Sequence, residues 1–295
     1  MQNQLLENLF AYKKTAALLA AFKLGLFRQI KKYGSMNKDI CRQLAWNEKH
    51  TMLLCVFLKN EGYLSYLDGC FQLSKDFESQ LDAFENICEH ESSLYHKWMS
   101  PEQLASSIKT EEGRLFDKEG FTPEEQNAYD NVMYGNNLNL ISFHILRNIK
   151  RDRTSPVRCL EYGRSDGRIG IALKKHIPKI IVDVVAYNQT IQEQSVYDVI
   201  LIYNTIHYKT SEGWETAFCQ MKKALNERGV VCIADVFYNE DNLFQSTVLL
   251  DWITHGGVYN IYSKEIAEQL KSNGFARVEQ QPIAAISMDI LFAYK

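Results

Sequence analysis

Residues 157–170 constrain the fold of this chain more than any other segment. They begin with a short apolar strand over 157–160 and continue through Glu161 into a turn that carries Gly163, Ser165 and Gly167. A helical pattern follows over 168–175. A strand, a turn of small residues and a helix N-terminus together let backbone N–H groups approach a ligand closely. We therefore expect a ligand-binding turn here, with a plain connection between strand and helix as the alternative.

The spacing of the small residues in this turn limits the kind of ligand. A dinucleotide-binding turn has glycine at its first, third and sixth positions, which here are Gly163, Ser165 and Arg168. Arg168 breaks that pattern. Small residues do occupy the first, third and fifth positions, and Glu161 precedes the first by two residues. The turn is therefore not that of a typical dinucleotide-binding protein.

The last half of the chain alternates between strand and helix patterns. Alternation with mostly buried strands is typical of an α/β, Rossmann-like doubly wound sheet that is largely parallel. Ligands of such sheets bind at the carboxyl ends of the strands, where polar side chains are expected. The predicted strands are 157–160, 179–185, 199–202 and 230–235, the predicted helices are 214–225 and 264–272, residues 226–229 are a predicted turn, and the polar residues at or near strand ends are Glu161, Asp183, Asn204 and Asp235.

The first 90 residues predict a small helical domain that ends in a hairpin. Asn37 can cap a helix that runs to about residue 44, a second helix covers 49–59, and Asp68-Gly69 is a typical hairpin turn between two short strands. Helix, helix and hairpin in this order indicate a winged helix. Residues 5–27 are apolar on more than one helical face, which predicts burial against a second copy of the chain.

Composition argues against several partners. Residues 1–90 contain 11 Lys and Arg against 10 Asp and Glu, and the whole chain has a net charge of −3 and a pI near 6.2. This balance argues against nucleic acid or an anionic membrane as a main partner. No apolar run of membrane-spanning length and no signal peptide is evident. The seven cysteines form no Cys-x-x-Cys pair and are expected to be buried, reduced thiols of a cytoplasmic protein. The histidines have no metal-ligand spacing, so no metal site is expected.

Residues 91–150 are expected to be a helical connector rich in aromatic side chains. Aromatic residues at helical spacing usually belong to a core. Because these precede the predicted ligand-binding domain, some of them are also candidates for lining a substrate pocket. The predicted organisation is thus residues 1–90, 91–150 and 151–295.

Several motifs in one register carry a resemblance to a known family. The chain resembles the small-molecule O-methyltransferases that have an N-terminal winged-helix dimerisation domain, the plant caffeate type and its bacterial relatives. The resemblance covers nearly the whole chain. The matching segments are 20–27, 58–64 with the hairpin, Trp98, 113–116, 129–133, 197–208, Gly256-Gly257 and 264–275.

The resemblance implies a class I methyltransferase that uses S-adenosyl-L-methionine (SAM) and acts on a small, aromatic hydroxyl acceptor of secondary metabolism, as a homodimer. His207 lies just past a strand end, at the place that matches the general base of the family. Histidine suits this role because its pKa lies near working pH. The family orients that histidine with an acid near the position of Tyr259. Asp235 is the candidate that could replace this acid. The implied SAM contacts are Glu161, Gly163, Ser165, Gly167, Asp183 (for the ribose hydroxyls) and Asn204, and the implied substrate contacts are Trp98, Tyr129, Met133 and Tyr259.

One segment departs from the family. Only fourteen residues separate Asp183 from Asp198, which leaves no room for the third strand and its adenine contact. Two hypotheses follow: an active methyltransferase with a trimmed cofactor site, or a protein of this fold that has lost methyl transfer. The second would catalyse a cyclisation, elimination or rearrangement, or act as a non-catalytic partner. A winged-helix transcription factor with a sensor domain is a third reading, and the charge count of residues 1–90 argues against it.

Overall fold

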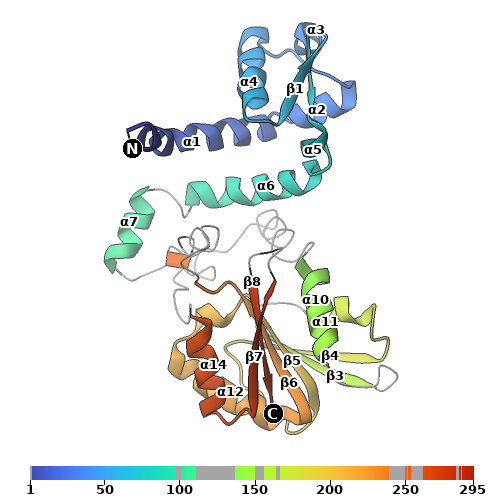
Figure 1. Ribbon diagram of the computed structural model, residues 1–295, viewed down its shortest axis with the longest axis vertical. Coiled ribbons are helices and arrows are strands. Elements are labelled where there is room, and N and C mark those ends of the chain that lie inside the picture. Colours follow the sequence, from blue (N-terminus) through green and yellow to red (C-terminus); the bar gives the residue numbers. More distant parts are fainter. Residues whose placement is uncertain are drawn as a thin grey trace. The chain divides into compact units, whose positions relative to one another are not determined.

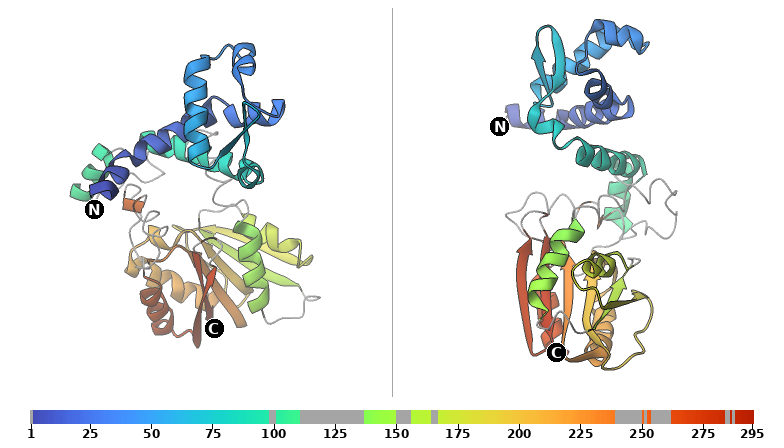
Figure 2. Two further views of the ribbon diagram at one scale, coloured as in Figure 1. Left: turned by 45° about the horizontal axis from the view of Figure 1, so that its top comes forward. Right: turned by 90° about the vertical axis from the view of Figure 1, so that its right-hand side faces the viewer.

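The computed structural model describes residues 2–97, 101–110, 137–149, 156–163, 167–238, 250, 252–253, 262–283, 286 and 288–295. The chain divides into two compact units (Figures 1 and 2). Described residues up to His96 belong to the first unit, and those from Lys97 onward belong to the second. The predicted boundary after residue 90 falls inside helix α6, so the predicted connector begins within a helix.

The N-terminal unit contains the helices and the hairpin that the sequence predicts. Asn37 accepts a hydrogen bond from the Ile40 N–H at 2.9 Å and begins α3, and Asn47 does the same for His50 and begins α4. The segment over 5–27 is interrupted at Leu24 and Gly25, between the end of α1 at Lys23 and the start of α2 at Leu26. The elements are α1 (Gln2–Lys23), α2 (Leu26–Tyr33), α3 (Lys38–Gln43), α4 (Glu48–Asn60), β1 (Leu64–Leu67), β2 (Cys70–Leu73), α5 (Lys75–Glu78) and α6 (Leu81–Lys97).

Aromatic rings hold the centre of this unit together. Phe77 lies edge-on to Phe27, Tyr63 and Phe84, with ring centroids 4.9, 5.0 and 5.0 Å away. Such pairs contribute about 0.5–1.5 kcal/mol each beyond the area that they bury. The contacts join α2, the start of the hairpin, α5 and α6 into one core.

The described strands of the C-terminal unit form a six-stranded sheet in the order β4-β3-β5-β6-β8-β7. The first four are parallel, and β8 and β7 add an antiparallel pair at one edge. The elements are α7 (Pro101–Thr110), α10 (Asn137–Asn148), β3 (Val157–Gly163), α11 (Arg168–Lys174), β4 (Ile180–Ala186), β5 (Tyr197–Tyr203), a 3₁₀ turn η1 (Ile206–Tyr208), α12 (Ser211–Ala224), β6 (Leu225–Asp235), α14 (Ser263–Ser272), β7 (Arg277–Ile283) and β8 (Met288–Tyr294).

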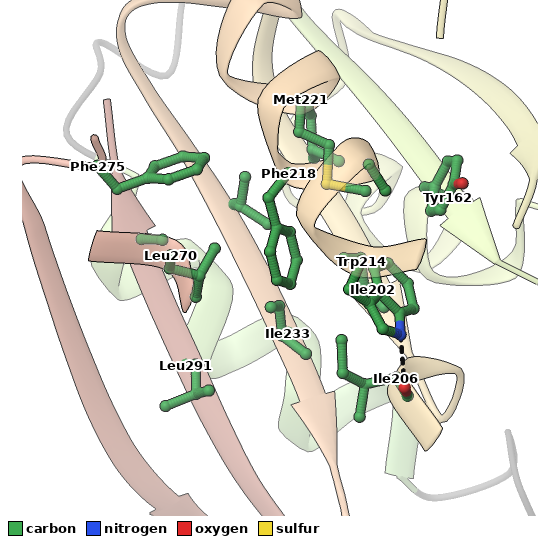
Figure 3. Close-up of a cluster of buried hydrophobic side chains, with 14 of the residues drawn as sticks. Tyr162, Ile202, Ile206, Trp214, Phe218, Met221, Ile233, Leu270, Phe275 and Leu291 are labelled. Atoms are coloured by element: carbon green, nitrogen blue, oxygen red, sulfur yellow. Dashed lines mark hydrogen bonds between the residues drawn. The ribbon is translucent and has the colours of Figure 1, made fainter. Parts of the chain in front are cut away.

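Helices cover both faces of this sheet, which confirms the predicted doubly wound architecture. Alternate residues of each strand point to opposite faces. On one face Ile202 and Ile233 pack against α12 and α14 (Figure 3), and Ile200 belongs to the same core cluster. On the other face Val199 and Leu201 belong to a core with α10 and α11. Every residue of β5 is buried, as expected for a central strand between two layers.

The missing third strand is also confirmed. Residues 187–196, all of which the structure describes, contain neither helix nor strand. This segment passes over the α12 side of the sheet, where Ile191 is buried and its N–H donates to Gln220 Oε1 at 3.2 Å. Ile191, with the partly buried Tyr187 and Val196, anchors the segment to the core, and β4 is an edge strand of the described sheet.

Two predictions about the strands were wrong or incomplete. The turn predicted at 226–229 lies within β6, which begins at Leu225. Tyr197 of β5 pairs with Leu225 of β6, and Val199 of β5 pairs with Val230 of β6. More residues of β6 than of β5 lie between these two pairs, so the register of the two strands shifts there. Residues of this stretch find partners outside the ladder with β5: Asn226 Nδ2 donates to Asp198 Oδ1 at 2.6 Å, and the Lys295 N–H donates to the Gly229 carbonyl at 3.2 Å. The sequence also assigned no strand after residue 235, where β7 and β8 occur.

Close packing between α11 and β4 makes a glycine necessary at residue 170. A Cβ atom there would lie 2.5 and 2.7 Å from the two methyl carbons of Val182. We expect Gly170→Ala to lower the free energy of unfolding by about 1–3 kcal/mol because the added methyl group overpacks this contact. Urea unfolding of the full chain measures the change.

Gly213→Ala in α12 is the matched control, since the atom nearest to its added Cβ would be 3.5 Å away. The control should be neutral or stabilising. In a Val182→Ala background the two methyl carbons are gone, so most of the Gly170→Ala penalty should disappear. A Gly170→Ala variant as stable as the unchanged protein would contradict this account.

Candidate active site

The carboxyl ends of β3, β5 and β6 meet at one edge of the sheet, because these strands are parallel neighbours. Doubly wound sheets bind ligands at this edge. Gly163 is the last residue of β3, Asn204 follows β5 and Asp235 is the last residue of β6. His207 lies in η1, just after β5. The structure therefore brings together candidate residues that are far apart in the sequence.

Asp235 is fully buried and holds the loop after β5. Its Oδ2 accepts the N–H groups of Thr205 at 2.9 Å and Ile206 at 3.0 Å, and its Oδ1 accepts the N–H of Val236 at 2.8 Å. A buried carboxylate needs such partners to offset its lost hydration. Asp235 thereby determines where the backbone before His207 lies.

The same carboxylate reaches the imidazole of His207. Nδ1 of His207 lies 3.3 Å from both oxygens of Asp235. Because an ionised carboxylate only accepts hydrogen bonds, this contact favours the tautomer with the proton on Nδ1 and leaves Nε2 as an acceptor. A base oriented by an acid is the arrangement that nucleophile activation requires.

Trp252 fixes the plane of the same imidazole. The indole and imidazole rings are stacked, with centroids 3.8 Å apart and planes inclined by 16°. Tyr208 lies against His207 as well, at 4.2 Å. His207 and Trp252 are both buried. Nothing in the sequence singled out Trp252, since it lies 45 positions after His207 and belongs to no recognised motif.

The glycine turn is described at both of its ends. Gly167 has φ of 87°, a left-handed conformation that other residues rarely adopt, and it immediately precedes α11. Glu161 is buried and its Oε2 accepts the Gly170 N–H at 3.2 Å, so this carboxylate ties β3 to the first turn of α11. A Cβ at Gly163 would lie 2.7 Å from Oγ1 of Thr205, so close packing against the loop after β5 also requires glycine there.

Asp183 is not brought to this edge. It lies three residues before the end of β4, and its Oδ2 is 2.7 Å from Nη2 of Arg158 on β3. The Arg158 guanidinium in turn lies over the ring of Tyr197, 5.3 Å from its centroid. Asp183 therefore joins β3 to β4 in the structure, and its placement differs from the strand end that the sequence predicted.

A chain of hydrogen bonds that the sequence did not predict connects the loops that surround the candidate site. Lys209 Nζ donates to the hydroxyl of Tyr162 at 2.9 Å, and that hydroxyl donates to the carbonyl of Tyr187 at 2.6 Å. Burial lowers the pKa of Lys209 and raises the pKa of Tyr162 to about 12. Tyr162 therefore stays neutral at pH 7 and can pass the hydrogen bond on, which links β3 to the loops after β4 and β5.

Five of the candidate residues lie outside the described residues: Ser165, Trp98, Tyr129, Met133 and Tyr259. Within the described part of the chain, no group of three or more His, Cys, Asp or Glu side chains could hold a metal ion. None of the helices that the structure describes is long and apolar enough to cross a membrane. Five of the seven cysteines are buried, as expected, and all are free thiols.

Comparison with known proteins identifies the fold. No family model and no curated protein sequence matches the chain. Among solved structures, PigF with S-adenosylhomocysteine (SAH) is similar with a TM-score of 0.79 at 17% identity, covering 100% of both chains. A putative O-methyltransferase from Nostoc punctiforme PCC 73102 has a TM-score of 0.76 at 18% identity, over 100% of this chain and 99% of that one.

Human N-acetylserotonin methyltransferase in complex with SAM is also similar, with a TM-score of 0.73 at 13% identity, over 100% of this chain and 97% of that one. The chain has the methyltransferase fold. In this fold the carboxyl edge that carries His207 and Asp235 is the candidate active site. At these identities the likeness establishes the fold, and the activity is argued next from the residues.

Proposed function

We propose that this protein is a SAM-dependent O-methyltransferase of secondary metabolism that acts on a small, aromatic hydroxyl acceptor, with His207 as general base. The observation that carries the proposal is the pairing of His207 Nδ1 with both oxygens of the buried Asp235, 3.3 Å away, at the carboxyl edge of the sheet. Similar solved structures that are described as an O-methyltransferase or as complexes with SAH or SAM support the same reaction class.

The chemistry of methyl transfer is chiefly a problem of positioning. SAM supplies the methyl group, and the acceptor oxygen must lie in line with the bond that breaks. A neutral hydroxyl is a weak nucleophile. His207, with Nδ1 directed at Asp235, has Nε2 left to take the hydroxyl proton, and Asp235 then stabilises the imidazolium that forms. The stacked Trp252 ring holds the imidazole plane during this transfer.

The residues of the carboxyl edge fit a nucleoside in part. Gly167 has a conformation that side chains disfavour, and a Cβ there would lie 3.2 Å from a methyl carbon of Val184, so the turn depends on glycine. We assign the contacts with SAM to Glu161, Gly163, Ser165, Gly167 and Asn204. We leave Asp183 out of this set because its carboxylate is paired with Arg158.

A second candidate is a protein of this fold that performs a cyclisation, elimination or rearrangement without methyl transfer. The specific observation in its favour is the segment 187–196, which contains neither helix nor strand in a region that the related fold uses for the adenine contact. His207 and Asp235 could serve proton transfer in either reaction.

Calorimetric titration of the folded protein with SAM and SAH distinguishes the two candidates. We expect micromolar binding if the first is correct. Gly167→Ala should weaken that binding by about tenfold or more, since the strained residue distorts the turn. Gly274→Ala is the matched control, because Gly274 also has a positive φ of 83° but follows α14. Absence of heat at millimolar SAM would support the second candidate.

We also propose that the protein forms a homodimer through its N-terminal helices. The support is the apolar character of residues 5–27 on more than one helical face. Leu18, Leu19 and Phe22 of this stretch are only half-buried within the described residues of one chain, which leaves apolar surface for a partner.

A further inference from the structure

The N-terminal unit contains a groove that the proposed methyl transfer does not use. It has a volume of about 640 Å³ and lies between α3, α4 and the hairpin β1–β2. This volume falls within the range of small-molecule sites. Lys38 and Arg42 of α3, Met52, Val56 and Lys59 of α4, and Tyr66 of β1 are among its lining residues.

One wall of the groove is apolar. Met52, Val56 and Lys59 follow each other at spacings of four and three residues, so they share one face of α4. Across from this face, the rings of Tyr66 and Phe71 pack with centroids 4.7 Å apart. Val56 remains 45% exposed and Tyr66 55% exposed. Apolar side chains left open to water inside a concave surface gain free energy when an apolar ligand covers them.

The other feature of the groove is its charge. Lys38, Arg42 and Lys59 line it against a single carboxylate, that of Asp39. Glu48 pairs with Lys38 at 3.1 Å and with Arg42 at 3.2 Å, and Asp39 pairs with Arg42 at 2.9 Å. Lys59 makes no ion pair with any residue that the structure describes. Even with Glu48 included, the groove keeps one positive charge in excess, and that charge sits at the end of the apolar face of α4.

We propose that this groove is a binding site for a small amphipathic organic anion. An aromatic or aliphatic body would lie on Met52, Val56 and Tyr66, and a carboxylate or sulfonate would lie at Lys59. Duplex DNA does not suit this surface, because exposed apolar side chains occupy the face of α4 and the first 90 residues are close to neutral overall. The proposal rests on the N-terminal unit alone and is independent of methyl transfer.

Calorimetric titration of the full chain with 1-naphthoate at low salt tests the proposal. We expect Lys59→Gln to weaken binding about threefold, the size expected for an exposed ion pair. Val56→Ser should weaken it by a similar factor through lost apolar contact. The neutral analogue 1-naphthamide should bind about threefold more weakly than 1-naphthoate to the unchanged protein, and this difference should shrink in Lys59→Gln.

Two matched controls lie on the same helix. Lys49→Gln and Leu53→Ser change exposed residues of α4 that do not line the groove, and they should leave the affinity unchanged. Circular dichroism checks that every variant is folded. The proposal is overturned if the unchanged protein shows no binding at millimolar 1-naphthoate, or if the groove variants bind as tightly as the unchanged protein. Equal weakening in the control variants would overturn it as well.

Discussion

Replacing His207 with alanine should lower kcat for methyl transfer to a hydroxyl acceptor by about 10²–10⁴-fold, the range typical of a lost general base. The affinity for SAM should stay unchanged, because the imidazole contacts Asp235, Tyr208 and Trp252 among the described residues. Steady-state kinetics over a pH series measures the effect.

Two further variants separate catalysis from folding. Asp235→Asn keeps the shape of the side chain but removes the carboxylate that favours the Nδ1 proton, so it should reduce kcat strongly. His176→Ala changes an exposed histidine that precedes β4, and it should have no effect. A loss of kcat of less than threefold in His207→Ala would contradict the assignment of the base, because the loss of a general base typically costs about 10²–10⁴-fold in rate.

Replacing Trp214 with alanine should lower the free energy of unfolding by about 3–5 kcal/mol, the cost typical of emptying a large aromatic site in a core. Trp214 is fully buried on α12 and packs on Phe218 and Tyr162 (Figure 3). Its Nε1–H donates to the carbonyl of Ile206 at 2.6 Å. The variant therefore leaves a cavity and removes this hydrogen bond to the loop before His207. Urea unfolding followed by circular dichroism measures the loss.

Trp214→Phe distinguishes the two contributions. Phenylalanine refills most of the space but cannot donate to Ile206, so it should lose clearly less stability than alanine does. Because Ile206 directly precedes His207, the phenylalanine variant should also lower the activity more than its stability loss explains. A Trp214→Ala variant destabilised by less than about 1 kcal/mol would show that the core repacks, contrary to this account.

Most of the C-terminal fold could be predicted from local patterns. The four parallel strands are apolar runs separated by turn residues and helical periods, and buried strands leave that trace in a sequence. The absence of a third strand was predictable too, because the count of residues between Asp183 and Asp198 limits what can fit. The ends of β6 and the pair β7–β8 were not, since register and edge pairing depend on neighbours distant in the chain.

The candidate site shows the same division. His207 was identified because it lies just past a predicted strand and matches the base of the family, and Asp235 because it ends a predicted strand; parallel neighbours bring such positions to one edge. The stack of Trp252 on His207 and the bond from Lys209 to Tyr162 join segments that share no local pattern. The assignment of Asp183 to the ribose came from the family resemblance and its place on the second predicted strand, and only the structure reveals its pairing with Arg158.

The sequence by itself determined the four parallel strands and their order, the glycine turn and the shortened link before β5, because these depend on short-range periodicity, backbone restriction and chain length. Tertiary structure alone decided which side chains meet: Asp235 with the loop that carries His207, Trp252 with the imidazole, and Arg158 with Asp183. Such contacts depend on how layers pack in three dimensions, and a linear pattern does not contain that information.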